Sequence, residues 1–222
     1  TVTAYLNIYY GLWSSSQSQT YVNHTVANID TAVATVDMAG MSGVLANLID
    51  PGLTPAVASV LTSATNRDRV AAAVQSVNAR LKNLAQKYQA PLMDWYGLSK
   101  TILGPNTDLH STLKVGNVSL NLRGSDPGTP SSAPTKAFVS DGFHPNTAMQ
   151  GIFANLVLQA LHLGYGAGLD LFSEQEILNH ALISYGGSDT LLSQIGAYTN
   201  YVFLPTLPRI TVPYVAGTNV VL

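Results

Sequence analysis

The chain has 222 residues, a formal net charge of −2, only 10% charged residues and no cysteine. Its hydrophobic content of 46% suffices for a folded core, and the absence of a basic run argues against nucleic acid or an anionic membrane as the main partner. Without cysteine there is no disulfide framework, no thiol nucleophile and no cysteine-type zinc site, and no apolar run has the length of a membrane span.

The first quarter of the chain predicts one clear helix. Residues 2–10 are rich in β-formers and predict a strand or an extended loop, and residues 11–19 predict a polar loop with Trp13 and three serines. Apolar residues at helical spacing come next: Val22, Val26, Ile29, Val33 and Val36. Gly40 stands just past them, where a glycine typically ends a helix.

Two short strands and a second helix follow. The apolar run 44–49 and the run 91–95 are typical of buried parallel strands. Between them lies a second amphipathic pattern, which Thr65 or Asn66 can cap: Val70, Val74, Val77, Leu81, Leu84 and Tyr88. Helices that alternate with strands predict a parallel sheet with right-handed crossovers, in which working residues lie at the carboxyl ends of the strands.

The region 104–138 predicts a long loop with one hairpin around 115–122, because Pro, Gly, Asn, Ser and Thr dominate it. An amphipathic helix over about 146–162 comes after it. Ser173 and Glu176 form a capping box that opens a further helix, which Gly186-Gly187 ends.

The last part of the chain predicts little regular structure. Ser188 caps one more short helix through Ile195, and the tail 201–222 predicts extended structure, such as an edge strand.

Asp141 and His144 are the side chains most suited to chemistry. Asp141 lies three residues before His144, and Pro145 follows the histidine at the start of the predicted helix. The carboxylate can fold back onto one ring nitrogen, which fixes the imidazole tautomer and leaves the other nitrogen free to act as a base. An Asp-Gly sequence is also a common turn, so a structural role remains the alternative.

The sequence around this pair resembles a known family. Asp-Gly-Phe-His-Pro-Asn at 141–146, followed by Ala148, Gly151 and Ile-Phe-Ala-Asn at 152–155, resembles the last sequence block of the SGNH (GDSL-type) hydrolases. The resemblance covers roughly residues 20–163. It implies an α/β flavodoxin-like three-layer sandwich with a parallel sheet, and a Ser-His-Asp triad in which Asp141 and His144 are catalytic.

The family's earlier motifs have no counterpart in this chain. Neither the Gly-Asp-Ser of the nucleophile nor the Gly-x-Asn-Asp of the oxyanion hole occurs. The chain therefore resembles the C-terminal half of such a hydrolase, with 1–163 as the C-terminal portion of the hydrolase domain and 164–222 as an extension packed on it. The serine and the oxyanion hole are expected in an N-terminal segment or a second polypeptide. Such a segment would also complete the sheet, because so few strands leave an apolar edge uncovered.

The serines of this chain are weak candidates for the nucleophile. Ser188 has small neighbours, but a helix cap explains it better; Ser140 is too close to His144 in sequence to reach its ring easily. The serines at 14–16 lie on the predicted loop, where contact with a substrate is more plausible than catalysis.

The resemblance implies a carboxylic ester hydrolase of esterase or lipase type, with an ester as substrate. It implies no cofactor, and no His, Asp or Glu set has the spacing of a metal site. Low charge and many Ser, Thr and Asn residues favour a secreted or periplasmic protein. The alternative from another class is a non-catalytic binding or assembly module that has a hydrolase-like fold.

Overall fold

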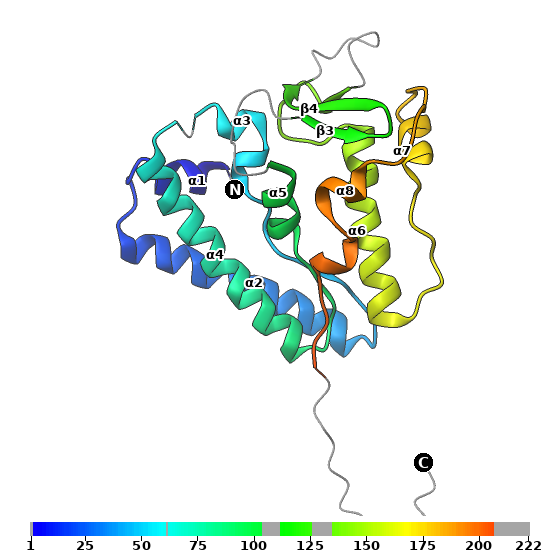
Figure 1. Cartoon of the computed structure of the whole chain (residues 1–222). Helices are drawn as coiled ribbons and strands as arrows, with labels where there is room; N and C mark the ends of the chain where they lie inside the picture. The colour runs from blue at the N-terminus through cyan, green and yellow to red at the C-terminus, as the bar shows by residue number, and fades with distance from the viewer. Residues whose placement is uncertain (1, 61, 104–111, 126–134, 207–222) are drawn as a thin grey trace, which may run out of the picture.

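The computed structural model of the protein describes residues 2–60, 62–103, 112–125 and 135–206. The structure is mixed α/β and contains two small three-stranded sheets, each partly parallel (Figure 1). Parts of the predicted loop 104–138 and of the tail 201–222 lie outside the described residues. Among the described helices, none combines the length and the apolar character that a membrane crossing needs.

The first sheet has the order β1-β2-β6, with β1 at Leu45–Ala46, β2 at Leu92–Met93 and β6 at Val202–Phe203. β1 and β2 are parallel, as the sequence predicts, and β6 joins β2 as an antiparallel edge strand. Both parallel strands are shorter than predicted. Beyond β1 the chain leaves the ladder because the Asn78 amide binds both backbone groups of Leu48, at 2.8 and 3.0 Å.

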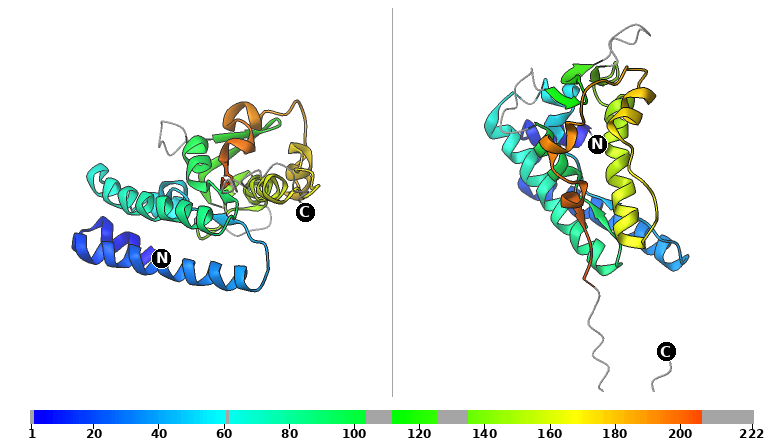
Figure 2. Two further views of the ribbon diagram at one scale, coloured as in Figure 1. Left: turned by 90° about the horizontal axis from the view of Figure 1, so that it is seen from below. Right: turned by 45° about the vertical axis from the view of Figure 1, so that its right-hand side comes forward.

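Helices cover both faces of this sheet (Figures 1 and 2). α2 (Ser15–Met38) and α4 (Ala64–Lys87) pack on each other and on Leu92, whereas α6 (Thr147–Tyr165) packs on Met93. Leu92 and Met93 are neighbours in β2, so their side chains point to opposite faces. This short strand therefore separates two apolar cores, one under each helical layer.

The second sheet has the order β3-β4-β5. β3 (Thr112–Val115) and β4 (Val118–Ser125) form the predicted hairpin. β5 (Lys136–Phe138) pairs in parallel with β4 and leads directly into Asp141. β5 was not predicted, because three residues carry no alternation pattern and their pairing partner lies elsewhere in the chain.

The N-terminal predictions were wrong in two places. Residues 2–10 form a helix, α1 (Val2–Tyr9), rather than a strand, because the buried Ile8 and Tyr9 pack against α4 and this packing overrides the β-propensity. The polar loop is shorter than predicted, since Ser14 caps α2 in a capping box with Gln17.

Other boundaries also differ from the prediction. Ser63 caps α4, in place of Thr65 or Asn66. The capping box at Ser173 is confirmed, but its helix α7 (Glu174–His180) ends well before the glycines. α8 (Leu191–Ile195) begins after Thr190, so Ser188 is not its cap.

Four short helical segments were not predicted. They are η1 (Pro51–Leu53), α3 (Pro55–Ala58), α5 (Trp95–Leu103) and η2 (Tyr198–Tyr201). Three of them have four residues or fewer, which is too short for a helical repeat to show in the sequence. α5 follows β2 directly, and its buried residues, such as Leu98, belong to the same core as α6.

Candidate active site

The segment 139–146 is a tight loop that backbone hydrogen bonds close between β5 and α6. The N–H of Val139 donates to the carbonyl oxygen of His144 at 2.9 Å, and the N–H of Asn146 donates to that of Ala137 at 2.9 Å. Gly142 has a left-handed φ of +66°, and its N–H donates to Val139 at 2.8 Å. The loop is therefore held at several points, which keeps His144 in a defined place.

Asn146 fixes the start of the following helix. Its side-chain oxygen accepts the N–H of Met149 at 3.0 Å, so Asn146 is the N-cap of α6 and Thr147 is the first helical residue. The sequence predicted Pro145 at the start of the helix, whereas in the structure Pro145 lies before the N-cap. The helix itself is confirmed, and it runs three residues beyond the predicted end.

Asp141 binds His144 at two places. One carboxylate oxygen, Oδ2, lies 2.5 Å from Nδ1 of the ring. The other, Oδ1, accepts the backbone N–H of Phe143 at 2.8 Å and that of His144 at 3.0 Å. These hydrogen bonds, the one from the His144 ring above all, lower the pKa of Asp141 to about 2. The carboxylate is ionised at neutral pH, so Nδ1 carries a proton toward it and Nε2 is the free nitrogen.

The ring is accessible from solvent. The side chain of His144 is 77% exposed and that of Asp141 is 47% exposed. Phe143, which lies between them, is partly buried and packs against the cluster of Ile8, Val57 and their apolar neighbours. The apolar side chain of Phe143 thus anchors the loop, whereas the polar side chains of Asp141 and His144 are accessible to solvent.

A contact to another segment places the loop relative to the first sheet. The carbonyl oxygen of Gly142 accepts the N–H of Ala56 at 3.1 Å. Ala56 belongs to α3, in the segment that follows β1. Asp141 and His144 therefore lie near the edge of the sheet that contains the C-terminal ends of the parallel strands. In α/β proteins, ligand-binding and catalytic residues commonly lie at this edge.

The serines that the sequence offered as weak candidates for the nucleophile form no hydrogen bond to the His144 ring in the described structure. Within the described residues, no serine hydroxyl is hydrogen-bonded to its ring. Ser14 accepts the N–H of Gln17 as a helix cap, and Ser188 lies on an exposed loop. Among the described residues, no serine therefore joins the contact between Asp141 and His144.

Other polar residues at the strand ends have structural partners. The Asn47 amide donates to Asp94 Oδ1 at 2.6 Å, and Asn47 accepts the N–H of Tyr96 at 2.9 Å. Asp50 caps the next turn through Gly52 and forms an ion pair of 3.4 Å with Lys100. Among the described residues, no three His, Asp or Glu side chains are grouped to hold a metal ion.

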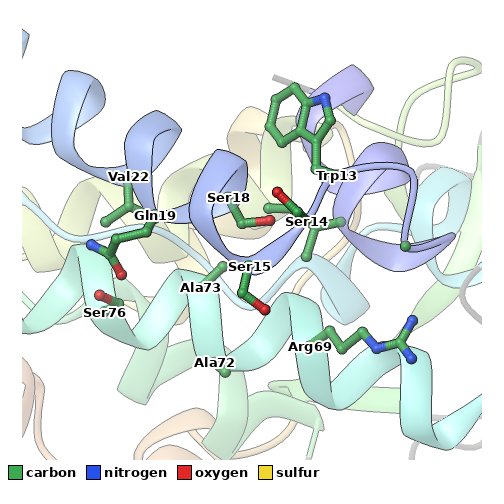
Figure 3. A pocket seen from close by; sticks show the side chains of 12 residues that line it. Trp13, Ser14, Ser15, Ser18, Gln19, Val22, Arg69, Ala72, Ala73 and Ser76 are labelled. Atoms are coloured by element: carbon green, nitrogen blue, oxygen red, sulfur yellow. The ribbon is translucent and has the colours of Figure 1, made fainter.

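One cleft of the described structure is separate from Asp141 and His144. It has a volume of about 530 Å³ and lies between the α1–α2 corner and α4 (Figure 3). Its walls carry Arg69, Gln19 and several serines, among them Ser15 and Ser18. Neither Asp141 nor His144 lines it, although Ile8 belongs both to its wall and to the cluster beneath Phe143.

Comparison of the chain with protein-family models, with curated proteins and with solved structures finds no match.

Proposed function

We propose that this chain supplies the acid–base part of a serine ester hydrolase of the SGNH type. His144 is the general base and Asp141 the residue that orients it, and the nucleophilic serine and oxyanion hole come from outside this chain. The observation that carries the proposal is the 2.5 Å contact between Asp141 Oδ2 and His144 Nδ1, in a histidine whose side chain is 77% exposed. This is the arrangement that a nucleophile–base–orienter relay requires of its last two members.

The chemistry of the complete site is acyl transfer in two steps. Nε2 of His144 takes the proton of the serine hydroxyl while the serine oxygen attacks the acyl carbon, and Asp141 stabilises the imidazolium that forms. His144 then gives this proton to the leaving alcohol oxygen as the ester bond breaks. Water, deprotonated by the same nitrogen, attacks the acyl carbon of the acyl-enzyme. His144 then returns this proton to the serine oxygen as the bond between that oxygen and the acyl carbon breaks, which releases the acid and restores the serine.

The outer edge of β1 supports the idea that another segment completes the fold. Leu45 and Asn47 donate their N–H groups to β2, so Ala46 between them directs its backbone groups away from the sheet. No described strand pairs with this edge. A strand added there, between the helical layers of α2 and α6, would extend the sheet toward a flavodoxin-like three-layer sandwich.

A cleft beside that edge is lined largely by apolar side chains, which suits the binding of such a segment. It has a volume of about 320 Å³ and is lined by Val44 and Leu45 of the edge, by Val33 and Val36 of α2 and by Tyr165 of α6. Burial of apolar surface here would contribute roughly 25 cal/mol per Å². The proposed segment is an N-terminal part of the same protein or a second polypeptide, and it carries the serine.

To test the proposal, the protein is purified in its native assembly and labelled with a fluorophosphonate probe, which reacts with nucleophilic serines. The mass of each polypeptide is then measured by mass spectrometry under denaturing conditions. The proposal expects a label on a co-purifying polypeptide or preceding segment, and expects His144→Ala to abolish it. His24→Ala serves as the control, because His24 is exposed on α2 and far from the loop in sequence.

Two outcomes would contradict the proposal. A label on a serine within these 222 residues would place the nucleophile in this chain. Absence of any label, with ester turnover unaffected by His144→Ala, would favour the alternative, a non-catalytic binding or assembly module with a hydrolase-like fold.

A further inference from the structure

The cleft between the α1–α2 corner and α4 adjoins an apolar recess. The cleft has a volume of about 530 Å³, and the recess, of about 90 Å³, lies among α1, α2 and α4. Ile8, Val22 and Ala73 line both of them, so cleft and recess meet at these three side chains. Neither is lined by Asp141 or His144, which separates them from the proposed acid–base site.

Arg69 brings a positive charge to the cleft. Its side chain extends from α4 toward the α1–α2 corner (Figure 3), and a Cβ added to Gly11 in that corner would lie 3.0 Å from the guanidinium nitrogen Nη1. Gly11 has a left-handed φ of +66° and no side chain, so it allows both the turn and this close approach. Arg69 forms no hydrogen bond or ion pair with any described residue, so its donors are available to a ligand.

The positive charge of Arg69 has no counterpart in the walls. Among the described residues, no Asp, Glu, Lys or His lines the cleft or the recess. The other polar side chains of the cleft are neutral, and the hydroxyl of Ser15 points toward α4 beside Arg69 (Figure 3). A single positive charge matches a single negative one, and the planar fork of a guanidinium matches the two oxygens of a carboxylate.

The recess is suited to hydrocarbon. Its lining includes the buried side chains of Ile8, Val22, Val74 and Val77. Apolar walls next to a small number of polar groups are typical of small-molecule sites, in which the polar groups fix the orientation of the ligand. Here the polar group is in the cleft and the apolar walls are in the recess, so a ligand that uses both has one charged end and one apolar end.

We propose that the cleft and the recess together bind a monocarboxylate with a short unbranched hydrocarbon chain. The guanidinium of Arg69 donates two hydrogen bonds to the carboxylate oxygens, and the hydroxyl of Ser15 donates a third. The chain passes Ile8 and Ala73 into the recess. This binding site does not rest on the proposed hydrolase chemistry.

Titration calorimetry of the full chain with hexanoate tests the proposal. Hexanol and hexylammonium have the same chain, but they are neutral and cationic. We expect hexanoate to bind and both analogues to bind at least tenfold more weakly, because they lose the charged hydrogen bonds to Arg69. Acetate should also bind at least tenfold more weakly than hexanoate, since each buried methylene contributes about fourfold in affinity.

Arg69→Gln should weaken hexanoate binding at least tenfold, and Arg67→Gln is the matched control. Arg67 is an exposed arginine of the same helix, and it lines neither the cleft nor the recess. Both variants change the net charge equally, so Arg67→Gln should bind hexanoate as the wild type does. Ala73→Leu places a larger side chain where cleft and recess meet, and it should weaken hexanoate binding but not acetate binding. Circular dichroism checks that each variant folds.

Four results would overturn the proposal. The first is no heat of binding with hexanoate at millimolar concentration. The second is equal affinity for hexanoate and hexanol, which would mean that charge plays no part. The third is equal affinity for hexanoate and acetate, which would mean that the chain is not bound. The fourth is equal hexanoate affinity in Arg69→Gln and Arg67→Gln. The first three use the wild-type chain, so they decide even if a variant does not fold.

Discussion

Asp141 holds both the ring and the backbone of His144, the ring through Oδ2 and the backbone N–H through Oδ1. One carboxylate therefore fixes the orientation of the imidazole and the shape of the loop that carries it. Loss of this carboxylate should change catalysis and loop stability together, and the two effects can be separated by measurement.

Asp141→Asn should reduce ester turnover of the complete enzyme by about four orders of magnitude, because an amide can stabilise the wrong imidazole tautomer. The measurement is kcat with a chromogenic ester on the native assembly. Asp170→Asn is the control, since Asp170 is exposed on the loop after α6. Equal turnover in the two variants would exclude Asp141 from the reaction.

Acid should remove a contribution of Asp141 to stability. Its pKa in the folded protein, about 2, is below the ordinary value of 3.8. The contribution is therefore present above about pH 4 and is lost as the pH falls toward 2, because the unfolded chain binds the proton first. Urea unfolding between these pH values should show a steeper loss of stability in the wild type than in Asp141→Asn. Parallel pH profiles would contradict this.

Gly142→Ala should destabilise the protein by about 1–2 kcal/mol, because a left-handed backbone costs that much in a residue with a side chain. An added Cβ would also lie 3.1 Å from the backbone nitrogen of Ala56. Gly168→Ala is the control, since its φ is ordinary and nothing lies within 4 Å of an added Cβ. Chemical unfolding measures both variants, and a neutral Gly142→Ala would mean that the loop relaxes freely.

Glu174→Gln should cost about 1.5–3 kcal/mol of stability, because hydrogen bonds from two backbone N–H groups lose their charged acceptor. Hydrogen exchange should speed up at the N–H groups of Gly116 and Leu191 in particular. Glu176→Gln, which alters only the exposed capping box at Ser173, should have a smaller effect and leave the exchange at Gly116 unchanged.

The open edge of β1 predicts that the isolated 222-residue chain self-associates in gel filtration with light scattering. Ala46→Pro should reduce this association, because it removes the N–H that points away from β2 and leaves the donors Leu45 and Asn47 in place. Circular dichroism checks that the variant folds. A stable, well-folded wild-type monomer would contradict the idea that a further segment completes the sheet.

Much of the structure could be predicted where the pattern is local. Apolar residues at helical spacing, such as Val22 and Val26 in α2, predicted the long helices, and the capping box at Ser173 predicted the start of α7. The three-residue spacing of Asp141 and His144 predicted a carboxylate–imidazole contact, which the structure confirms at 2.5 Å. Periodicity, caps and short spacings act within one or two turns of chain, so the amino-acid order by itself determines them.

Long-range contacts decided the rest. α1 is a helix because Ile8 and Tyr9 are buried against α4, and β5 is a strand because β4 lies beside it. The tail that contains β6 was predicted as extended structure such as an edge strand, but only the tertiary structure showed that its partner is β2. Likewise, only the fold brings Glu174 to Gly116 and Leu191. Burial and pairing between distant residues depend on the whole chain, and no local pattern encodes them.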